Sequence, residues 1–315
     1  MDLVTQASAP CAPPGAPPSR TTLRWVEECL GRGAEVRMVR PLAGGAAHAN
    51  HALLVESRSG SAHRLVLRRW TPRARGAGSP VPRGTDADFS PEREIAALAL
   101  LAGCEVPTPS LVAADPAGAY CDAPALLITR LKGHPPRPSP DDLPEYLIQL
   151  AAALLAVHSR GGASTMPPYV PYNRLDQRRA PRHALRPQLW ERAFEIAAGP
   201  SPEAAHRFIH RDYHPDNTLW SYSRLTGIVD WSDASYGPVA VDIAHMRLNL
   251  ALRYGPPAAE RFVAAFDQVS GGYRHHPYWD VRCLLDLLPE NDGRIIDEPT
   301  MPLVEDYLAQ LLATA

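Results

Sequence analysis

A short stretch in the second half of the chain places carboxylate, amide and imidazole side chains close together. It reads HRDYHPDN over residues 210–217, and thirteen residues after Asn217 an apolar Ile-Val pair leads to Asp230. Phosphoryl transfer needs a carboxylate that orients or deprotonates the attacking hydroxyl, together with hard oxygen ligands that hold Mg²⁺ against the phosphates. A loop followed by a strand hairpin can bring Asp212, Asn217 and Asp230 to one cation, so the spacing fits this chemistry.

This stretch resembles the aminoglycoside phosphotransferase and choline kinase group, whose fold is that of the protein kinases. The pattern H-x-D-x-H-P-x-N, followed by a strand that ends in Asp-Trp, is typical of that group. The resemblance extends over residues 22–312 and is strongest over 208–243. It implies that Asp212 is the catalytic base, that Asn217 and Asp230 bind Mg²⁺, and that His210 and Asp242 support the catalytic loop.

A kinase-like site also needs a cation on a strand of the N-terminal half and an acidic helix residue to hold it. Lys132 is the only lysine of the chain, so the cation on the strand 64–70 is expected to be Arg68, where many members have lysine. Arginine makes forked, planar contacts with phosphate, so the replacement is chemically viable. The resemblance gives Glu94 as its partner, with Glu92 as a second candidate.

Further nucleotide contacts are expected from two loops of the same half. Gly44 and Gly45 lie between the first two strands, where family members cover the phosphates, and they allow a close backbone approach. The segment around Thr129 and Leu131 falls where the adenine-binding hinge of the family lies. Asp233, three residues after Asp230, lines the acceptor side of the cleft in one interpretation and caps a turn in the other.

The elements that must position these residues follow from hydrophobic periodicity and turn signals. We expect an α+β, two-lobed, protein-kinase-like fold: an antiparallel sheet lobe with one key helix, then a larger, mainly helical lobe. The expected boundaries are a disordered Pro/Ala-rich tail over 1–20, a nucleotide-binding lobe over 21–131 and a helical lobe with the acceptor site over 132–315. Expected strands lie at 36–39, 51–55, 64–70, 110–114, 125–131, 217–220 and 226–231, and expected helices at 21–30, 91–102, 144–158, 240–252, 257–269, 277–289 and 302–313.

Composition limits the alternatives. The net charge of −2 excludes the strong basic excess of a general nucleic-acid binder. The five cysteines contain no C-x-x-C pair, which favours free thiols in a reducing compartment. No signal peptide and no membrane span are predicted, so we expect a soluble, cytoplasmic protein.

The expected partners are therefore ATP, with GTP left open, Mg²⁺ and a small-molecule hydroxyl acceptor. Residues 212–315 carry an acidic excess, which favours a cationic acceptor such as an aminoglycoside or an amino alcohol. Three alternatives stay open: a kinase of a metabolite such as an amino alcohol or sugar, a kinase-like protein that binds nucleotide without transfer, and a metal hydrolase. The hydrolase would use His206, His210, Asp212 and His214 as metal ligands.

Overall fold

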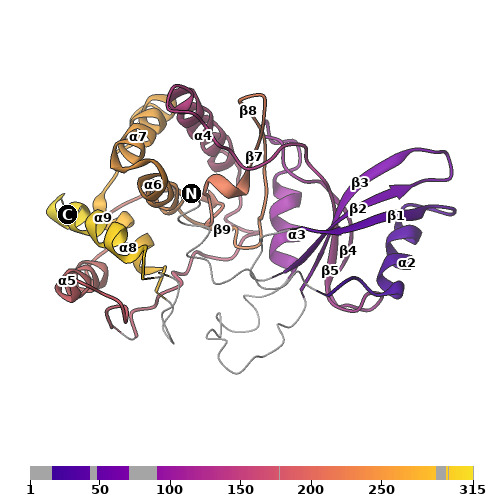
Figure 1. Cartoon of the computed structure of the whole chain (residues 1–315), viewed down its shortest axis with the longest axis horizontal. Helices are drawn as coiled ribbons and strands as arrows, with labels where there is room; N and C mark the ends of the chain where they lie inside the picture. Colours follow the sequence, from indigo (N-terminus) through magenta and orange to yellow (C-terminus); the bar gives the residue numbers. More distant parts are fainter. Residues whose placement is uncertain are drawn as a thin grey trace.

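The computed structural model describes residues 16–42, 48–70, 91–176, 178–288, 296 and 298–314. Within them, an antiparallel sheet with two helices is followed by a larger, mainly helical part, which is the α+β arrangement expected (Figure 1). Gly44, Gly45 and the loop 72–90 lie outside the described residues.

The first half forms a five-stranded sheet with the order β1-β2-β3-β5-β4. All neighbouring pairs are antiparallel, and β1 to β3 form the predicted meander. β5 inserts between β3 and β4, so that it can lead from the sheet into the second half. The strands are β1 (Glu35–Pro41), β2 (Ala49–Glu56), β3 (Ala62–Arg69), β4 (Leu111–Asp115) and β5 (Ala125–Thr129).

Alternation along the strands divides the sheet into two faces, each covered by one helix. Leu65 and Leu67 of β3 pack with Trp25 and Val26 of α2 (Arg20–Cys29). Val66, between those two leucines, packs on the other face with residues of α3 (Pro91–Leu100). Since successive strand residues point to opposite faces, Arg68 shares the face of Val66. That face looks toward the helical part, because α3 lies between it and the sheet (Figure 1).

The first helix begins earlier than expected. The hydroxyl of Ser19 accepts a hydrogen bond from the backbone of Thr22, so Ser19 is the N-cap and Arg20 the first helical residue. The prediction that Thr21 or Thr22 caps this helix was therefore wrong. Thr22 instead donates its hydroxyl to Asp122 at 2.8 Å, which ties α2 to the loop before β5.

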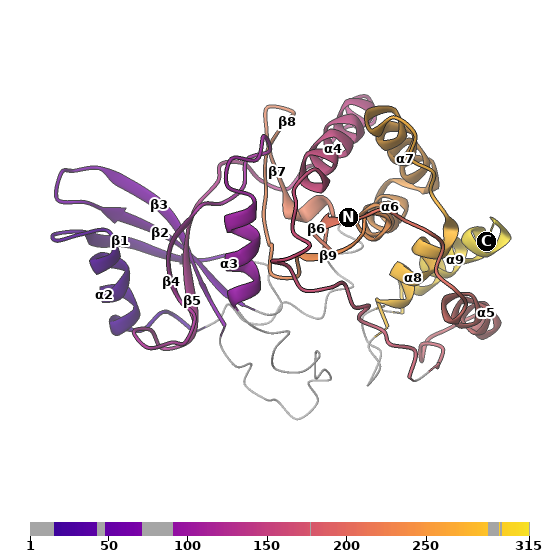
Figure 2. The same cartoon turned by 180° about the vertical axis from the view of Figure 1, so that it is seen from behind.

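The helical part is built around α6 (Ala240–Tyr254), which is buried on nearly all sides. A helix that is buried all round must have packing partners on every face, and here α7 and α8 supply most of them (Figure 2). The expected helices are all present, and α5 was not predicted. The remaining helices are α4 (Leu143–His158), α5 (Pro187–Ala198), α7 (Pro256–Ser270), α8 (Pro277–Leu285) and α9 (Met301–Thr314).

Two small antiparallel ribbons hold the stretch that carries the chemistry. β7 (Thr218–Ser221) pairs with β8 (Arg224–Ile228), close to the predicted hairpin. β6 (His206–Ile209) pairs with β9 (Ser235–Pro238), and this ribbon was not predicted. Residues 210–217, including the short 3-10 helix η2 (Pro215–Asn217), lie between the two ribbons in sequence.

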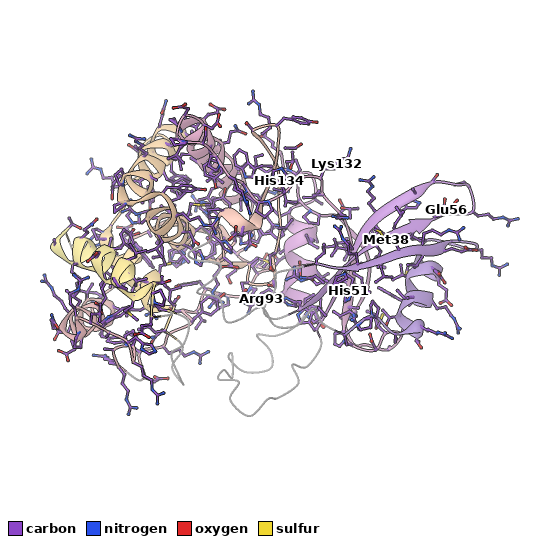
Figure 3. All side chains as sticks on the ribbon, viewed as in Figure 1. Met38, His51, Glu56, Arg93, Lys132 and His134 are labelled. Carbon is purple, nitrogen blue, oxygen red and sulfur yellow. The ribbon has the colours of Figure 1, made fainter. Side chains whose placement is uncertain are left out.

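The connector between the two halves is attached to β7. His134 exchanges two backbone hydrogen bonds with Trp220, at 3.1 and 2.8 Å, and Lys132 accepts a hydrogen bond from the Thr226 hydroxyl at 2.6 Å. Figure 3 shows Lys132 and His134 at this junction. Gly133 makes the approach possible. It has a φ of +116°, and a Cβ there would lie 2.5 Å from Thr226 Oγ1.

Candidate active site

Arg68 joins the two halves of the molecule through one guanidinium group. Its Nε lies 3.0 Å from Glu94 Oε2 and its Nη2 lies 2.5 Å from Asp230 Oδ1. Nη2 also lies 2.9 Å from Nδ1 of His48. Arg69 points to the other face, where it pairs with Asp122 at 2.7 Å. Strand alternation thus decides which of the two arginines enters the site.

Glu94 is the partner of Arg68. It is buried and Glu92 is exposed, which resolves the two sequence candidates. Burial raises the pKa of Glu94 above its usual range, although the charge of Arg68 opposes this. Asp233 lies beside Asp230, since the Ser232 hydroxyl reaches both carboxylates, at 2.9 Å to Asp230 and 3.4 Å to Asp233.

Asp242 holds the loop before Asp212 from the first turn of α6. Its buried carboxylate accepts hydrogen bonds from the backbone N–H of His210 at 2.9 Å, the backbone N–H of Arg211 at 2.6 Å and Nε2 of His158 at 2.9 Å. His210 contacts the carbonyl oxygen of Val229 through Nε2 at 3.0 Å, which ties this loop to the segment that carries Asp230.

Two residues of the site have left-handed backbone conformations. Arg211 has a φ of +71° and Asp230 a φ of +66°, values that are uncommon for side chains other than glycine. Such conformations persist only where the surroundings enforce them. For Arg211 the enforcing contacts are the Asp242 carboxylate and the face of Tyr172, whose ring centre lies 3.9 Å from the guanidinium carbon.

Asp212 is fixed by the amide of Asn217. Nδ2 of Asn217 donates to the backbone carbonyl of Asp212 at 2.9 Å and to its Oδ2 at 3.0 Å. The amide oxygen of Asn217 then faces away from Asp212, toward the side on which a ligand can approach. Asn217 Oδ1 and Asp230 Oδ2 accept no hydrogen bond from the described residues. Two such hard oxygens fit a magnesium ion.

Two imidazoles flank Asp212. His245 Nε2 lies 3.2 Å from Oδ1, and His214 Nε2 lies 3.6 Å from Oδ2. Burial raises the pKa of Asp212, but the neighbouring histidines outweigh it, so that the pKa lies well below its usual range. His245 was missed in the sequence. Its signal is its position three residues after Asp242, one helical turn further along α6.

The comparisons with known proteins follow this geometry. A family model described as the Phosphotransferase enzyme family matches residues 38–282, which is most of the chain. The chain belongs to this family. No curated protein sequence matches it at a significant level.

Solved structures similar to this phosphotransferase family member share its whole architecture. The apoenzyme of macrolide 2'-phosphotransferase MphH from Brachybacterium faecium has 18% identity and a TM-score of 0.58, with 94% of this chain and 93% of that chain covered. A thermostable mutant of aminoglycoside phosphotransferase APH(4)-Ia, in a ternary complex with ADP and hygromycin B, has 15% identity and a TM-score of 0.61, covering 94% and 99%. A macrolide 2'-phosphotransferase type I has 17% identity and a TM-score of 0.54, covering 94% and 97%. The predicted kinase-like fold is thereby confirmed.

The hinge of this phosphotransferase family member differs in one point from expectation. The backbone N–H of Thr129 donates to the carbonyl of Ser110 at 2.9 Å, so it is used inside the sheet. Leu131 packs against β8 instead. A Cβ at Gly227 would lie 2.3 Å from Leu131 Cδ1, so glycine is needed there for this contact. Adenine contacts of the hinge therefore fall to the backbone beyond Thr129.

The ligand set of the hydrolase alternative does not come together. His206 is exposed on β6 and stacks edge-on against Tyr236, with ring centres 6.2 Å apart. His210 is buried, and its ring nitrogens face the Val229 carbonyl and the backbone N–H of Asp212. Among the helices that the structure describes, none is long and apolar enough to cross a membrane.

Proposed function

We propose that this protein transfers the γ-phosphoryl group of ATP to a hydroxyl group of a small molecule, with Mg²⁺ as the metal ion. The observation that carries the proposal is the arrangement of Asp212, Asn217 and Asp230 opposite the Arg68–Glu94 pair. Each group has the chemistry that one part of phosphoryl transfer requires. Membership of a phosphotransferase family supports the same conclusion.

Asp212 receives the acceptor hydroxyl in this proposal. The Asn217 amide fixes the orientation of its carboxylate, and the low pKa keeps it ionised, so that it can accept a hydrogen bond from the hydroxyl. The hydroxyl proton passes to Asp212 as the oxygen attacks phosphorus in line with the leaving group. Positioning of the two reactants supplies most of the rate enhancement.

Asn217 and Asp230 hold the metal ion, and Arg68 contacts the phosphates. When bound, Mg²⁺ neutralises charge on the β- and γ-phosphates of the nucleotide. Arg68 contacts Asp230 at 2.5 Å in the structure without nucleotide, so it must share or give up this contact when phosphates arrive. Glu94 stays with Arg68 and sets the direction of its guanidinium.

We further propose a cationic acceptor, with an aminoglycoside as the first candidate. Acidic residues outnumber arginines over residues 212–315, and a cleft of one charge sign attracts ligands of the opposite sign. One similar solved structure holds hygromycin B, and two others are macrolide 2'-phosphotransferases. The panel below therefore includes both antibiotic classes.

One observation favours a second candidate, a protein that binds nucleotide without transfer. The Arg68–Asp230 ion pair occupies a carboxylate oxygen that a catalytic metal would use. The two candidates predict different results in one experiment. Purified protein is incubated with ATP, Mg²⁺ and each member of a panel of aminoglycosides, macrolides, choline, homoserine and simple sugars, and the acceptor mass is measured.

Transfer adds one phosphoryl group to one acceptor, and Asp212→Ala abolishes this product. Bound ATP with no product across the panel would contradict the proposed transferase and support the second candidate. Arg224→Ala is the matched control, because this side chain is 77% exposed on the β8 end of the hairpin and should leave transfer unchanged.

A further inference from the structure

We propose that Asp212, His214 and His245 form a binding site for a zinc-like divalent transition-metal ion, separate from the magnesium site at Asn217 and Asp230. The three residues come from two elements. Asp212 and His214 lie on the loop after β6, and His245 lies in the second turn of α6. Each offers one ligand atom, and these atoms lie within 4.8 Å of one another.

The distances match what such an ion needs. His245 Nε2 and Asp212 Oδ1 are 3.2 Å apart, and His214 Nε2 and Asp212 Oδ2 are 3.6 Å apart. Bonds of about 2.0–2.1 Å in a tetrahedral site place ligand atoms about 3.3 Å from each other. The two imidazole rings are 5.6 Å apart and tilted by 33°, so both can turn one nitrogen toward a common point. Small side-chain movements are sufficient to complete the site.

The protonation states suit a metal ion. Asp212 is ionised, and burial lowers the pKa of His245 to about 4, so this imidazole is neutral and has a lone pair to offer. A metal-bound histidine needs an acceptor for the proton on its other nitrogen. For His214 that acceptor is the Asp216 carboxylate, whose Oδ2 lies 3.9 Å from Nδ1.

Ligand chemistry separates this site from the magnesium site. Imidazole nitrogen suits zinc, cobalt and copper, whereas magnesium prefers oxygen ligands in an octahedral arrangement. Asn217 and Asp230 offer only oxygen to a cation. Two nitrogens and one carboxylate at His214, His245 and Asp212 leave a fourth position for water or another ligand, as in open zinc sites.

Occupation of this site has a consequence that rests on the proposed function. A cation on Asp212 neutralises the carboxylate that would receive the acceptor hydroxyl. Zinc would then inhibit transfer even when magnesium and ATP are saturating. The binding of the metal ion itself does not depend on the proposed function and is measured separately.

The test titrates metal-free protein, without nucleotide, with Co²⁺ and follows its visible absorption. We expect one Co²⁺ per chain with the intense bands of low-coordinate cobalt. His245→Ala should weaken binding more than about tenfold, because a whole ligand is lost where even outer contacts matter about 10–100-fold. His206→Ala is the matched control, since His206 is exposed on β6 outside the cluster, and it should bind as the wild type does.

Three results would overturn the proposal: no bound Co²⁺, binding that His245→Ala leaves unchanged, or displacement of Co²⁺ by millimolar Mg²⁺. If His245→Ala does not fold, as judged by its thermal unfolding, His214→Ala gives the same comparison from the loop. For an active wild type, the fraction of activity lost to Zn²⁺ should fall in the His245→Ala protein. Co²⁺ binding without this inhibition would contradict the role of Asp212 in transfer and leave the metal site intact.

Discussion

Nη2 of Arg68 lies 2.5 Å from Oδ1 of Asp230, while Nε of the same side chain lies 3.0 Å from Oε2 of Glu94. One guanidinium group therefore connects β3, α3 and the segment after β8. The forked shape of arginine makes this possible, because its nitrogens point in different directions. The arginine side chain is 5% exposed and Glu94 1%, so neither charge is compensated by water.

Arg68→Ala should lower the free energy of unfolding by about 3–5 kcal/mol, since it leaves a buried Glu94 without its partner. Arg68→Lys should lower it less, by about 1.5–3 kcal/mol, because an ammonium group replaces two directed contacts with one. Urea unfolding of both variants measures this. Equal losses for the two substitutions would show that the forked contacts of Arg68 do not matter.

Asp242→Ala should destabilise the protein by about 3 kcal/mol or more. The substitution leaves the buried backbone N–H groups of His210 and Arg211 without an acceptor, at about 1–3 kcal/mol each. Asp306→Ala is the control. Its carboxylate is 65% exposed and pairs with Arg186 on the surface, so its loss should cost less than about 1 kcal/mol. Similar unfolding curves for the two variants would remove Asp242 as a support of the loop.

Much of this molecule could be predicted from its sequence, since the signals were local. Alternation along residues 64–70 placed Arg68 and Arg69 on opposite faces, and the motif over 210–217 identified the family. The β6–β9 ribbon was missed because each strand has only four residues and no clear alternation. His245 was missed because its approach to Asp212 depends on how α6 packs, which no local pattern encodes.

Gly133→Ala should destabilise the connector between the two halves. The Cβ would lie 2.5 Å from Thr226 Oγ1 and 2.9 Å from the backbone of Trp220, and the φ of +116° is already unfavourable for alanine. Gly272→Ala separates the two effects, because Gly272 has a φ of +130° and no atom within 4 Å of the added carbon. It should cost only the conformational penalty of about 1–2 kcal/mol. Thermal unfolding of both variants should show a larger loss for Gly133→Ala, and equal losses would contradict the close approach to Trp220.

His245 makes the stability of the metal-free protein depend on pH. Burial lowers its pKa from 6.5 to about 4 in the folded chain. Between these values the unfolded chain binds a proton that the folded chain does not, so His245 destabilises the folded state as the pH falls from about 6.5 to 4. The free energy of unfolding, measured by urea at several pH values, should therefore depend less steeply on pH in His245→Gln than in the wild type. Parallel curves would show that His245 is not buried as an uncharged group.

The most direct test of the account compares the wild type with Asp212→Asn, which keeps the shape of the side chain and removes its charge. Nucleotide affinity with Mg²⁺ should change little, while the rate of acceptor phosphorylation should fall by about 10²–10⁴. That result would place Asp212 at the acceptor hydroxyl rather than at the nucleotide. An Asp212→Asn protein that phosphorylates its acceptor at the wild-type rate would contradict the central claim.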